Sequence, residues 1–555
     1  MTLAVRGLLA DFQPYSLEGV TLSIGLLLSF VSRLQSSYNA ANFVWVALYF
    51  VHTFVYNVFF HPLRHIPGPL LARGSGIPYA LRVRNGTIVP WVQELHQKYG
   101  DAVRLAPSDV SFISGETAWP DIYGFRTGKY RNTGAYLKDR TWFPKPLNGV
   151  WSIIQSDEED HSRMRRNVSQ AFSEKALRQQ EALLQGYVDL LVHRLGEVGE
   201  DSEPVDIMRW YNYTTFDIIT DLSFGEPLYC LRDNAYHVWV NLIFKSIRST
   251  SLTAIRKKYV LFDCIDKLKN LFEDTTAPQR ARKQFFDMAS EKVTKRLEKE
   301  TDRPDFFSFI LKNQDAETKA LSRDEMDSNA IIFLIAGSET TATTLSGTTY
   351  LLLKHPDKYT KLVHEIRSRF SSLSEITMEE VNKLNYLIAC LQEGLRYYPP
   401  VPTGFPRVVP RGGNQISGHY IPEGTSVYVS QHATNHSMRN FKDPDVYVPE
   451  RWLGDEKYVN DNRDAMNPFS FGPRNCLGKK YVLPSPLADI IIGRRFANSH
   501  LSSLAYAEMR LILAKVLFKY DLVLSNKTQD WIEEQRVFTL WEKPSLMVHL
   551  RPVQR

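Results

Sequence analysis

An apolar run near the N-terminus gives the chain its first recognisable element. Residues 41–60, ANFVWVALYFVHTFVYNVFF, contain no formally charged side chain. About 20 such residues in a helix match a bilayer core of about 30 Å, so the run predicts a membrane span, with a buried core helix as the alternative. A shorter apolar run at 19–31, bounded by Glu18 and Arg33, is open to three interpretations: a second span, an interfacial helix or a signal-like segment.

The stretch after residue 60 cannot continue a helix. HPLRHIPGPLLA places Pro62, Pro67 and Pro69 around a glycine, and proline fixes φ and removes a backbone donor. We therefore expect a rigid bend in the chain between a membrane anchor region at 1–61 and a globular domain at 62–555. No A-x-A-like cleavage site is evident, so the anchor is expected to be retained.

Composition adds limits on the class of protein. The 555 residues are 43% hydrophobic and 23% charged, which is ordinary for a folded chain, and the length alone predicts several domains. A net charge of +6 without a Lys/Arg run argues against a nucleic-acid partner. None of the four cysteines forms a CxxC pair, which argues against zinc and disulfide frameworks and favours a reducing compartment. They are Cys230, Cys264, Cys390 and Cys476.

One of these cysteines lies in a Gly/Pro loop, NPFSFGPRNCLGKK. Phe469, Gly472, Arg474, Cys476 and Gly478 fit the pattern FxxGxRxCxG. A thiolate can be the single protein ligand of haem iron, and loop N–H groups and a following helix N-terminus would stabilise its charge. The arginine could pair with a haem propionate and the phenylalanine could shield the sulfur. The alternative is a structural cysteine in a turn, but five matching positions favour the haem site.

This loop resembles the cysteine loop of the cytochrome P-450 superfamily, and a long apolar helical pattern at 330–356 agrees with it. Its polar island AGSETT contains Gly337, Glu339 and Thr340, matching the AGxE/DTT of the family's long helix. The glycine would let a ligand approach the backbone, and a threonine hydroxyl bonded one turn back would open a bulge. The resemblance implies that Thr340 delivers protons and that Glu339 is its acidic partner.

Two further stretches follow in the family's order. CLQEGLRYYPPVP holds Glu393 and Arg396 one helical turn apart, and PDVYVPERWL holds Arg451. The resemblance implies that these three residues form a buried structural cluster. An isolated ExxR has little value, because such pairs are common on any helix surface; its position before PERW and the cysteine loop makes it informative.

Three more residues are implied to hold the haem propionates. HSRMRRNVSQAFS places His161 and Arg165 one turn apart, where many family members have Trp in place of the histidine. Arg407 in TGFPRVVPRGG matches the arginine of the strand after the ExxR helix, with Arg411 as a nearby competitor.

The resemblance implies one mainly α domain with a small β region, a cytochrome P-450 fold behind the anchor, in place of the several domains that length predicts. It implies haem b, a membrane-bound place on the cytosolic side of the endoplasmic reticulum, and NADPH as electron source. No flavin- or nicotinamide-binding segment is evident, so electrons would come through a separate reductase, with cytochrome b5 as a second donor. A basic surface could dock them; it comprises Arg163, Arg165, Arg166, Lys479 and Lys480.

The predicted activity is that of a monooxygenase acting on an apolar small molecule. Several stretches of the sequence, among them HPLRHIPGP and NHSMRNFKDPDVYVPERWL, are similar to those of filamentous-fungal family members that act in secondary metabolism. This resemblance suggests a terpenoid or polyketide intermediate as the substrate. Segments 119–151 and 210–252 would line the pocket, and the first mixes aromatic with basic residues. Two alternatives stay open: a haem-thiolate isomerase or dehydratase that does not use O2, and a non-catalytic haem carrier.

The sequence between the cysteine loop and the next helical pattern does not fit the family. Replacing residues 480–503 by one Asn gives CLGKNLAYAEMR, which resembles the family closely. Lys480-Tyr481-Val482 can encode an intron donor and Ser503 an acceptor. We therefore expect a retained intron here, with a genuine surface loop as the alternative.

Overall fold

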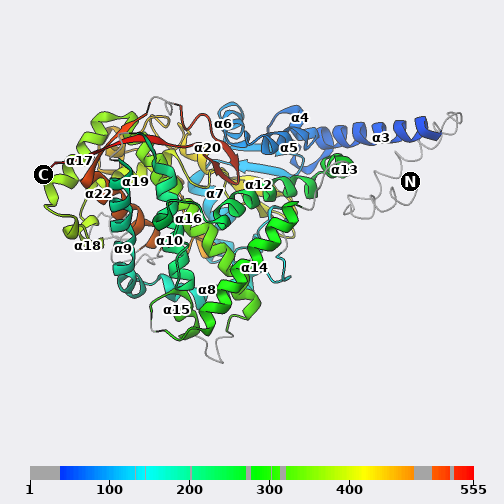
Figure 1. Cartoon of the computed structure of the whole chain (residues 1–555). Helices are drawn as coiled ribbons and strands as arrows, with labels where there is room; N and C mark the ends of the chain where they lie inside the picture. Colours follow the sequence, from blue (N-terminus) through cyan, green and yellow to red (C-terminus); the bar gives the residue numbers. More distant parts are fainter. Residues whose placement is uncertain are drawn as a thin grey trace. The chain divides into compact units, whose positions relative to one another are not determined.

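The computed structural model describes residues 38–131, 133–143, 146–199, 203–269, 277–301, 303–312, 320–479, 503–525 and 530–554 (Figure 1). The chain divides into two compact units, residues 1–64 and residues 65–555. The apolar run at 19–31 and residues 480–502 of the expected insert lie outside the described residues.

The first unit contains the helix expected from the apolar run, with different bounds. Helix α3 covers Tyr38–Val55 and passes into a π-helical turn, Tyr56–Phe60, followed by a 3-10 turn at Pro62–His65. No helix in the described ranges is both long and apolar enough to cross a membrane. The predicted span at 41–60 is therefore not supported; Asn42, His52 and Asn57 interrupt its apolar pattern.

Helices make up most of the second unit, as predicted. They are α4 (Leu70–Gly74), α5 (Ile77–Arg84), α6 (Ile88–Tyr99), α7 (Gly115–Tyr123), α8 (Glu158–Ser169), α9 (Glu174–Gly199), α10 (Ile207–Phe224), α11 (Cys230–Asp233), α12 (Val238–Lys258), α13 (Val260–Lys269), α14 (Ala277–Glu298), α15 (Phe306–Lys312), α16 (Arg323–Lys354), α17 (Pro356–Arg369), α18 (Met378–Val381), α19 (Asn385–Tyr397), α20 (Gln431–Asn435) and α22 (Leu504–Lys519).

The β structure is small and lies in four separate sheets. One sheet has the order β1-β2-β7-β4, with β2 and β7 parallel; another has the order β3-β11-β8, and β5–β6 and β9–β10 are two-stranded. The strands are β1 (Ala102–Ala106), β2 (Asp109–Phe112), β3 (Val205–Asp206), β4 (Arg407–Val408), β5 (Asn414–Ile416), β6 (His419–Ile421), β7 (Ser426–Val429), β8 (Tyr520–Leu524), β9 (Arg536–Phe538), β10 (Leu540–Glu542) and β11 (Met547–Pro552).

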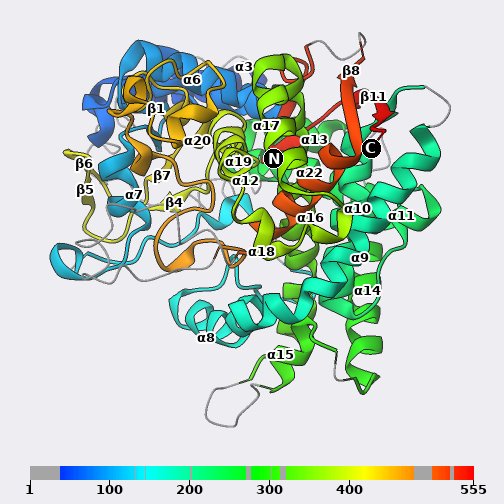
Figure 2. The same ribbon diagram turned by 90° about the vertical axis from the view of Figure 1, so that its left-hand side faces the viewer.

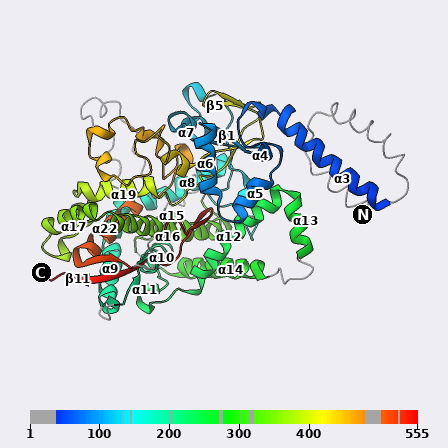
Figure 3. The ribbon, with the colours of Figure 1, turned by 90° about the horizontal axis from the view of Figure 1, so that it is seen from above.

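The second unit has a helical side and a β-rich side. Figure 2 shows α9, α10, α14, α16 and α22 gathered on one side, and the β1-β2-β7-β4 sheet with α6 and α7 on the other. Helix α16 runs through the middle, between α10 and α19 (Figure 3). It begins with a capping box in which Ser322 and Glu325 bond each other's backbone N–H groups.

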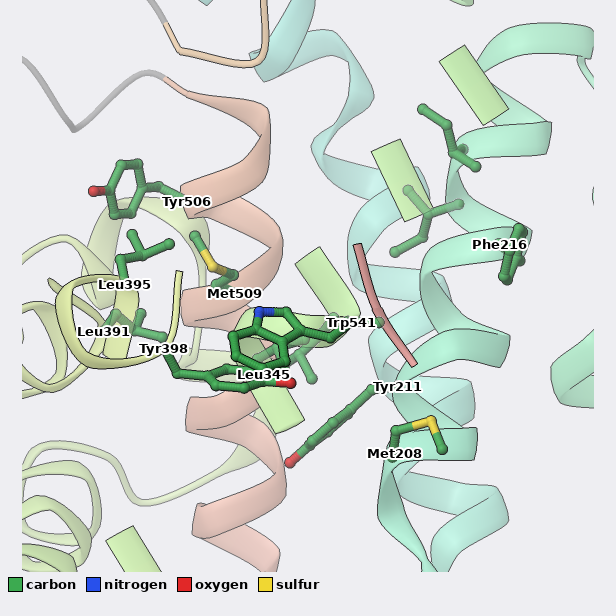
Figure 4. Close-up of a cluster of buried hydrophobic side chains, with 14 of the residues drawn as sticks. Met208, Tyr211, Phe216, Leu345, Leu391, Leu395, Tyr398, Tyr506, Met509 and Trp541 are labelled. Atoms are coloured by element: carbon green, nitrogen blue, oxygen red, sulfur yellow. The ribbon is translucent and has the colours of Figure 1, made fainter. Parts of the chain in front are cut away.

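The core that fixes α16 lies where it meets α10, α19 and α22. Figure 4 shows side chains of this core: Met208 and Tyr211 of α10, Leu391 and Leu395 of α19, and Tyr506 and Met509 of α22. All of these side chains are buried. Because α16 and α22 are packed into one core, the residues on α16 and the cysteine loop before α22 have fixed relative positions.

The described chain ends on either side of residues 480–502 lie next to each other. The Ser503 hydroxyl donates to the carbonyl oxygen of Gly478. A β-carbon added at Gly478 would lie 3.9 Å from Cβ of Ala505, the second residue of α22. Helix α22 therefore begins directly beside the cysteine loop.

Candidate haem-binding site

The cysteine loop is held in a conformation that needs glycine. Gly472 begins a 3-10 turn, Gly472–Arg474, with φ of 74°. A β-carbon there would lie 1.9 Å from the carbonyl oxygen of Tyr123, so no other residue fits without movement. The Cys476 N–H then donates to the carbonyl oxygen of Phe469 at 2.9 Å, and the Phe469 ring packs against Tyr506 of α22.

The Cys476 side chain is accessible although it lies deep in the fold. Its surface is exposed, while the surrounding protein raises the pKa of the thiol by burial. The N–H groups of Gly478 and Lys479 and the charge of Arg165 act in the opposite direction and favour the thiolate. A thiol in this setting can be reached by a ligand and is stabilised in the charged form that binds metal.

Buried cations gather near this thiol. Arg474 and Arg407 are joined by Lys138, which forms a β-bridge with Arg407. Arg407 is 2% exposed and Lys138 is 9% exposed. Burial, together with the charges of both arginines, moves the pKa of Lys138 well below its usual value, whereas Cys476 acts to raise it. Burial lowers the pKa of Arg407 to about 10.

His161 and Arg165 of α8 belong to the same region. His161 is buried, and burial followed by the charge of Arg474 lowers its pKa to about 3, so its imidazole is neutral. Arg165 donates to the carbonyl oxygen of Asn475 at 2.6 Å and to the Asn475 side chain. It therefore fixes the residue next to the cysteine. Arg411, the competitor of Arg407, is exposed.

This cationic cluster fits a ligand with carboxylate groups. Within the described ranges, Arg474 Nε and Nη1 and Arg407 Nε are buried without a hydrogen-bond partner. Among the described residues, the carboxylate paired with the cluster is Glu158, 3.8 Å from Arg474 Nη2 and half exposed. Buried cations without counter-charges are unfavourable, and two propionates would supply the missing charge and acceptors. The residues present therefore fit haem.

The polar island of α16 adopts only part of the expected geometry. Thr340 Oγ1 donates to the carbonyl oxygen of Ala336 at 2.7 Å, one turn back. The helix nevertheless continues without a bulge from Arg323 to Lys354. A β-carbon on Gly337 would lie 2.5 Å from Cδ1 of Ile219, so this glycine allows α10 to pack closely against α16. The structure gives Gly337 this packing role, and its part in ligand approach stays a prediction.

Glu339 is buried in an ion pair that the sequence did not predict. Its Oε2 lies 2.7 Å from Nζ of Lys543, which also donates to Thr343 Oγ1 at 2.8 Å. The side chains of Glu339 and Lys543 are 1% and 2% exposed. Glu339 Oε1 is buried without a hydrogen-bond partner.

Glu393, Arg396 and Arg451 form a completely buried cluster. Arg396 Nε and Nη2 donate to the two carboxylate oxygens of Glu393 at 2.9 and 2.8 Å, and Arg451 Nε donates at 3.0 Å. Two uncharged donors, the Val448 N–H and Trp452 Nε1, complete the shell at 2.9 Å each. The carboxylate is therefore saturated with donors, which suits a structural role.

Sequence reasoning missed Lys138 and Lys543. Lys138 lies within the segment predicted to line the pocket, in GAYLKDRTW, where a single lysine among aromatic residues was its only signal. Lys543, in LWEKPSLM, follows a short strand and gave no signal. The predicted basic docking surface is also reduced, because Arg163 pairs with Asp160 and Glu325.

The chain is similar to known proteins over most of its length. The family model Cytochrome P450 matches residues 69–481. Cytochrome P450 monooxygenase lcsI of Purpureocillium lilacinum is 48% identical over 92% of this chain and 93% of its own length. Cytochrome P450 monooxygenase traB of Penicillium crustosum is 45% identical over 98% and 100%. Cytochrome P450 monooxygenase atr2 of Stereocaulon alpinum is 41% identical over 98% of both. The chain therefore belongs to the cytochrome P450 family.

Proposed function

We propose that this chain is a haem-thiolate monooxygenase that inserts one atom of O2 into an apolar small molecule. Membership of the family makes the chain an oxidoreductase. The observation that carries the proposal is the accessible Cys476 thiol beside buried guanidinium nitrogens of Arg407 and Arg474 that have no hydrogen-bond partner in the described structure. Haem b, when bound, would supply activation of O2 at its iron.

The chain's own residues would then divide the work. Cys476 would ligate the iron, and the cluster of Lys138, His161, Arg165, Arg407 and Arg474 would bind and orient the propionates. Thr340 and Glu339 would hold and move protons on the opposite side of the haem. Glu393, Arg396 and Arg451 would stabilise the fold beneath the cysteine loop.

A small cavity of about 50 Å³, lined mostly by aromatic side chains, suits part of an apolar substrate with oxygen substituents. It is bordered by the β9–β10 hairpin through Val537 and Thr539, and by the Ser251 hydroxyl of α12. The indole N–H of Trp142 is buried there without a hydrogen-bond partner and could donate to a substrate oxygen. Terpenoid and polyketide intermediates have this character. The aromatic side chains lining the pocket are Tyr79, Trp142, Phe143, Phe405 and Tyr428.

Electrons would come from NADPH through a separate reductase, with cytochrome b5 as a second donor, on the cytosolic side of the endoplasmic reticulum. Arg166 is the exposed cation of α8 that could contact such a partner. Exposed apolar side chains support attachment to a membrane surface: Phe59 and Phe60 are 62% and 66% exposed, and Leu71 is 66% exposed. Protease treatment of sealed microsomes tests the location, since full protection would place the enzyme in the lumen.

We also propose that residues 480–503 are absent from the active form. The residues on either side of the segment lie close together, since a β-carbon added at Gly478 would lie 3.9 Å from Cβ of Ala505, and the family match ends at residue 481. A join with one Asn would keep α22 beside the cysteine, where its N-terminus favours the thiolate.

The carbon-monoxide difference spectrum of the reduced protein tests the central proposal. The thiolate absorption band should appear in the parent protein and in Cys390→Ser, and should be lost in Cys476→Ser. O2 uptake that depends on NADPH and reductase, with an oxygenated product, would separate a monooxygenase from an isomerase and from a haem carrier. A retained band in Cys476→Ser would refute the ligand assignment.

A further inference from the structure

We infer that Lys543 is a positioning residue for Glu339: it holds one oxygen of the buried carboxylate in an ion pair and so determines which oxygen can exchange a proton. The inference rests on the proposed function, because it concerns the acid proposed to move protons. It assigns a role to the segment between β10 and β11, which lies outside all the motifs found in the sequence.

The contacts of Glu339 carry this inference. Oε2 is occupied by the Lys543 ammonium at 2.7 Å, while Oε1 is buried without a hydrogen-bond partner in the described structure. The same ammonium donates to Thr343 Oγ1, one turn further along α16. Lys543 therefore binds one carboxylate oxygen and leaves the other as the acceptor that a proton can reach.

A buried carboxylate at this position needs a nearby cation. An isolated ionised carboxylate in a low-dielectric interior takes up a proton rather than remain charged. Glu339 is 1% exposed, so water cannot stabilise its charge. Lys543, 2% exposed and 2.7 Å from Glu339 Oε2, supplies that cation.

The position of Lys543 is fixed by the hairpin that precedes it. The Trp541 ring stacks on Tyr398 with centroids 4.8 Å apart, and its Nε1 donates to the Pro399 carbonyl oxygen at 2.8 Å. Figure 4 shows Trp541 lying over Tyr398 beside Leu345 of α16. On the other side, the Leu546 N–H donates to Asp206 at 3.0 Å. The ammonium is thus held from both ends of a short segment.

The proton balance at Glu339 is simple. Oε1 would take a proton relayed from solvent hydronium, forming an O–H bond at Glu339 and leaving a neutral water molecule. Release of that proton toward the Thr340 side restores the carboxylate. Lys543 takes no part in the transfer.

Other titratable groups near Glu339 do not replace Lys543. Tyr236 and Tyr398 interact electrostatically with Glu339, but burial raises the pKa of both phenols, so they stay neutral at physiological pH. On α22, the Glu508 carboxyl bonds to Thr341, and burial raises its pKa to about 8. Among the described residues that interact with Glu339, Lys543 is the cation paired with it.

Product formed per NADPH, measured against pH, tests the role of Lys543. In Lys543→Met, the buried Glu339 carboxylate loses its paired cation, so the product formed per NADPH should fall at pH 7 and its pH dependence should move to higher pH. Lys543→Arg keeps the charge and should restore most of the parent profile.

Lys515→Met is the matched control. Lys515 is also 2% exposed and paired with a carboxylate, Asp189, but on the face of α22 toward α9; its loss should leave the pH profile unchanged. A profile that does not move in Lys543→Met, in protein that still shows the thiolate band, would overturn the inference. Absence of the thiolate band in the parent protein would instead refute the proposed function.

A double-mutant cycle tests the pair without turnover. If Lys543 compensates the charge of Glu339, each single change leaves one unpaired buried charge, whereas the double variant Glu339→Gln/Lys543→Met leaves none. The double variant should therefore lose less stability than the two single changes added together. Additive losses of unfolding free energy would contradict the pairing, even where Lys543→Met is too unstable for kinetic work.

Discussion

Replacing Glu393 by Gln should destabilise the enzyme more strongly than its small change in shape suggests. Five donors converge on the two carboxylate oxygens, from Arg396, Arg451, Val448 and Trp452. The Gln side chain would turn an NH2 group toward some of these donors. It would also remove the negative charge that faces two guanidinium groups.

The size of the effect follows from burial. Glu393 and Arg396 are 0% exposed and Arg451 is 1% exposed, so solvent cannot replace the lost charge. Summing five separate hydrogen bonds would overcount, because they share one carboxylate. Removing one partner of a buried ion pair costs about 3–5 kcal/mol. Asp461 still pairs with Arg451, so the Arg396 guanidinium carries most of this loss.

Urea unfolding, followed by circular dichroism and by haem absorbance, measures the change. Glu379→Gln is the control, because the Glu379 side chain is 82% exposed in its pair with Lys383 and its loss should not be measurable. Protein of the Glu393 variant that retains haem should form as much product per NADPH as the parent, since the cluster is structural. A loss of unfolding free energy below about 1 kcal/mol would refute the argument that burial determines how much this cluster contributes to stability.

Three further expectations can be tested separately. Thr340→Ala should keep NADPH oxidation while product falls and peroxide rises; an unchanged product yield would remove Thr340 from proton delivery. Glu508→Gln should stabilise the protein at pH 8 but not at pH 5, because burial raises the pKa of the folded carboxyl to about 8. The native state then keeps a proton that the unfolded state releases, so the stability of the parent protein falls as the pH rises toward 8. An equal effect at both pH values would show that the carboxyl titrates normally. Sequencing cDNA across residues 480–503 should reveal a spliced transcript, and protein with one Asn in place of these residues should bind haem. An active full-length protein from an unspliced transcript would disprove the retained intron.

The parts of the fold that sequence could predict are those carried by local spacing. Glu393 and Arg396 are three residues apart on one helix, so their contact follows from helix geometry. Arg451 could be added only because the order of motifs resembled a known family. The predicted span failed for a local reason too, because counting uncharged residues at 41–60 ignored the asparagines and histidine within the run.

Pairings between distant segments left no local signal. Glu339 and Lys543 are 204 positions apart, and nothing in the residues around the lysine shows that its side chain enters the core. The environment of Gly337 was missed for a related reason: the AGSETT island shows that a small residue is needed, but only the packing of Ile219 shows which neighbour requires it.

Buried cations fall into two groups in the described structure, and the difference separates structural sites from ligand sites. Arg396 and Lys543 each contact a buried carboxylate of the chain itself, so their charge is balanced when folding is complete. Lys138 and Arg407 are nearly as well buried, yet burial and the charges of neighbouring arginines depress the pKa of each. A fold retains such an unfavourable arrangement where a ligand supplies the opposite charge. The charge pattern therefore supports the proposal that Lys138 and Arg407 bind haem propionates, by an argument that does not depend on the cysteine motif.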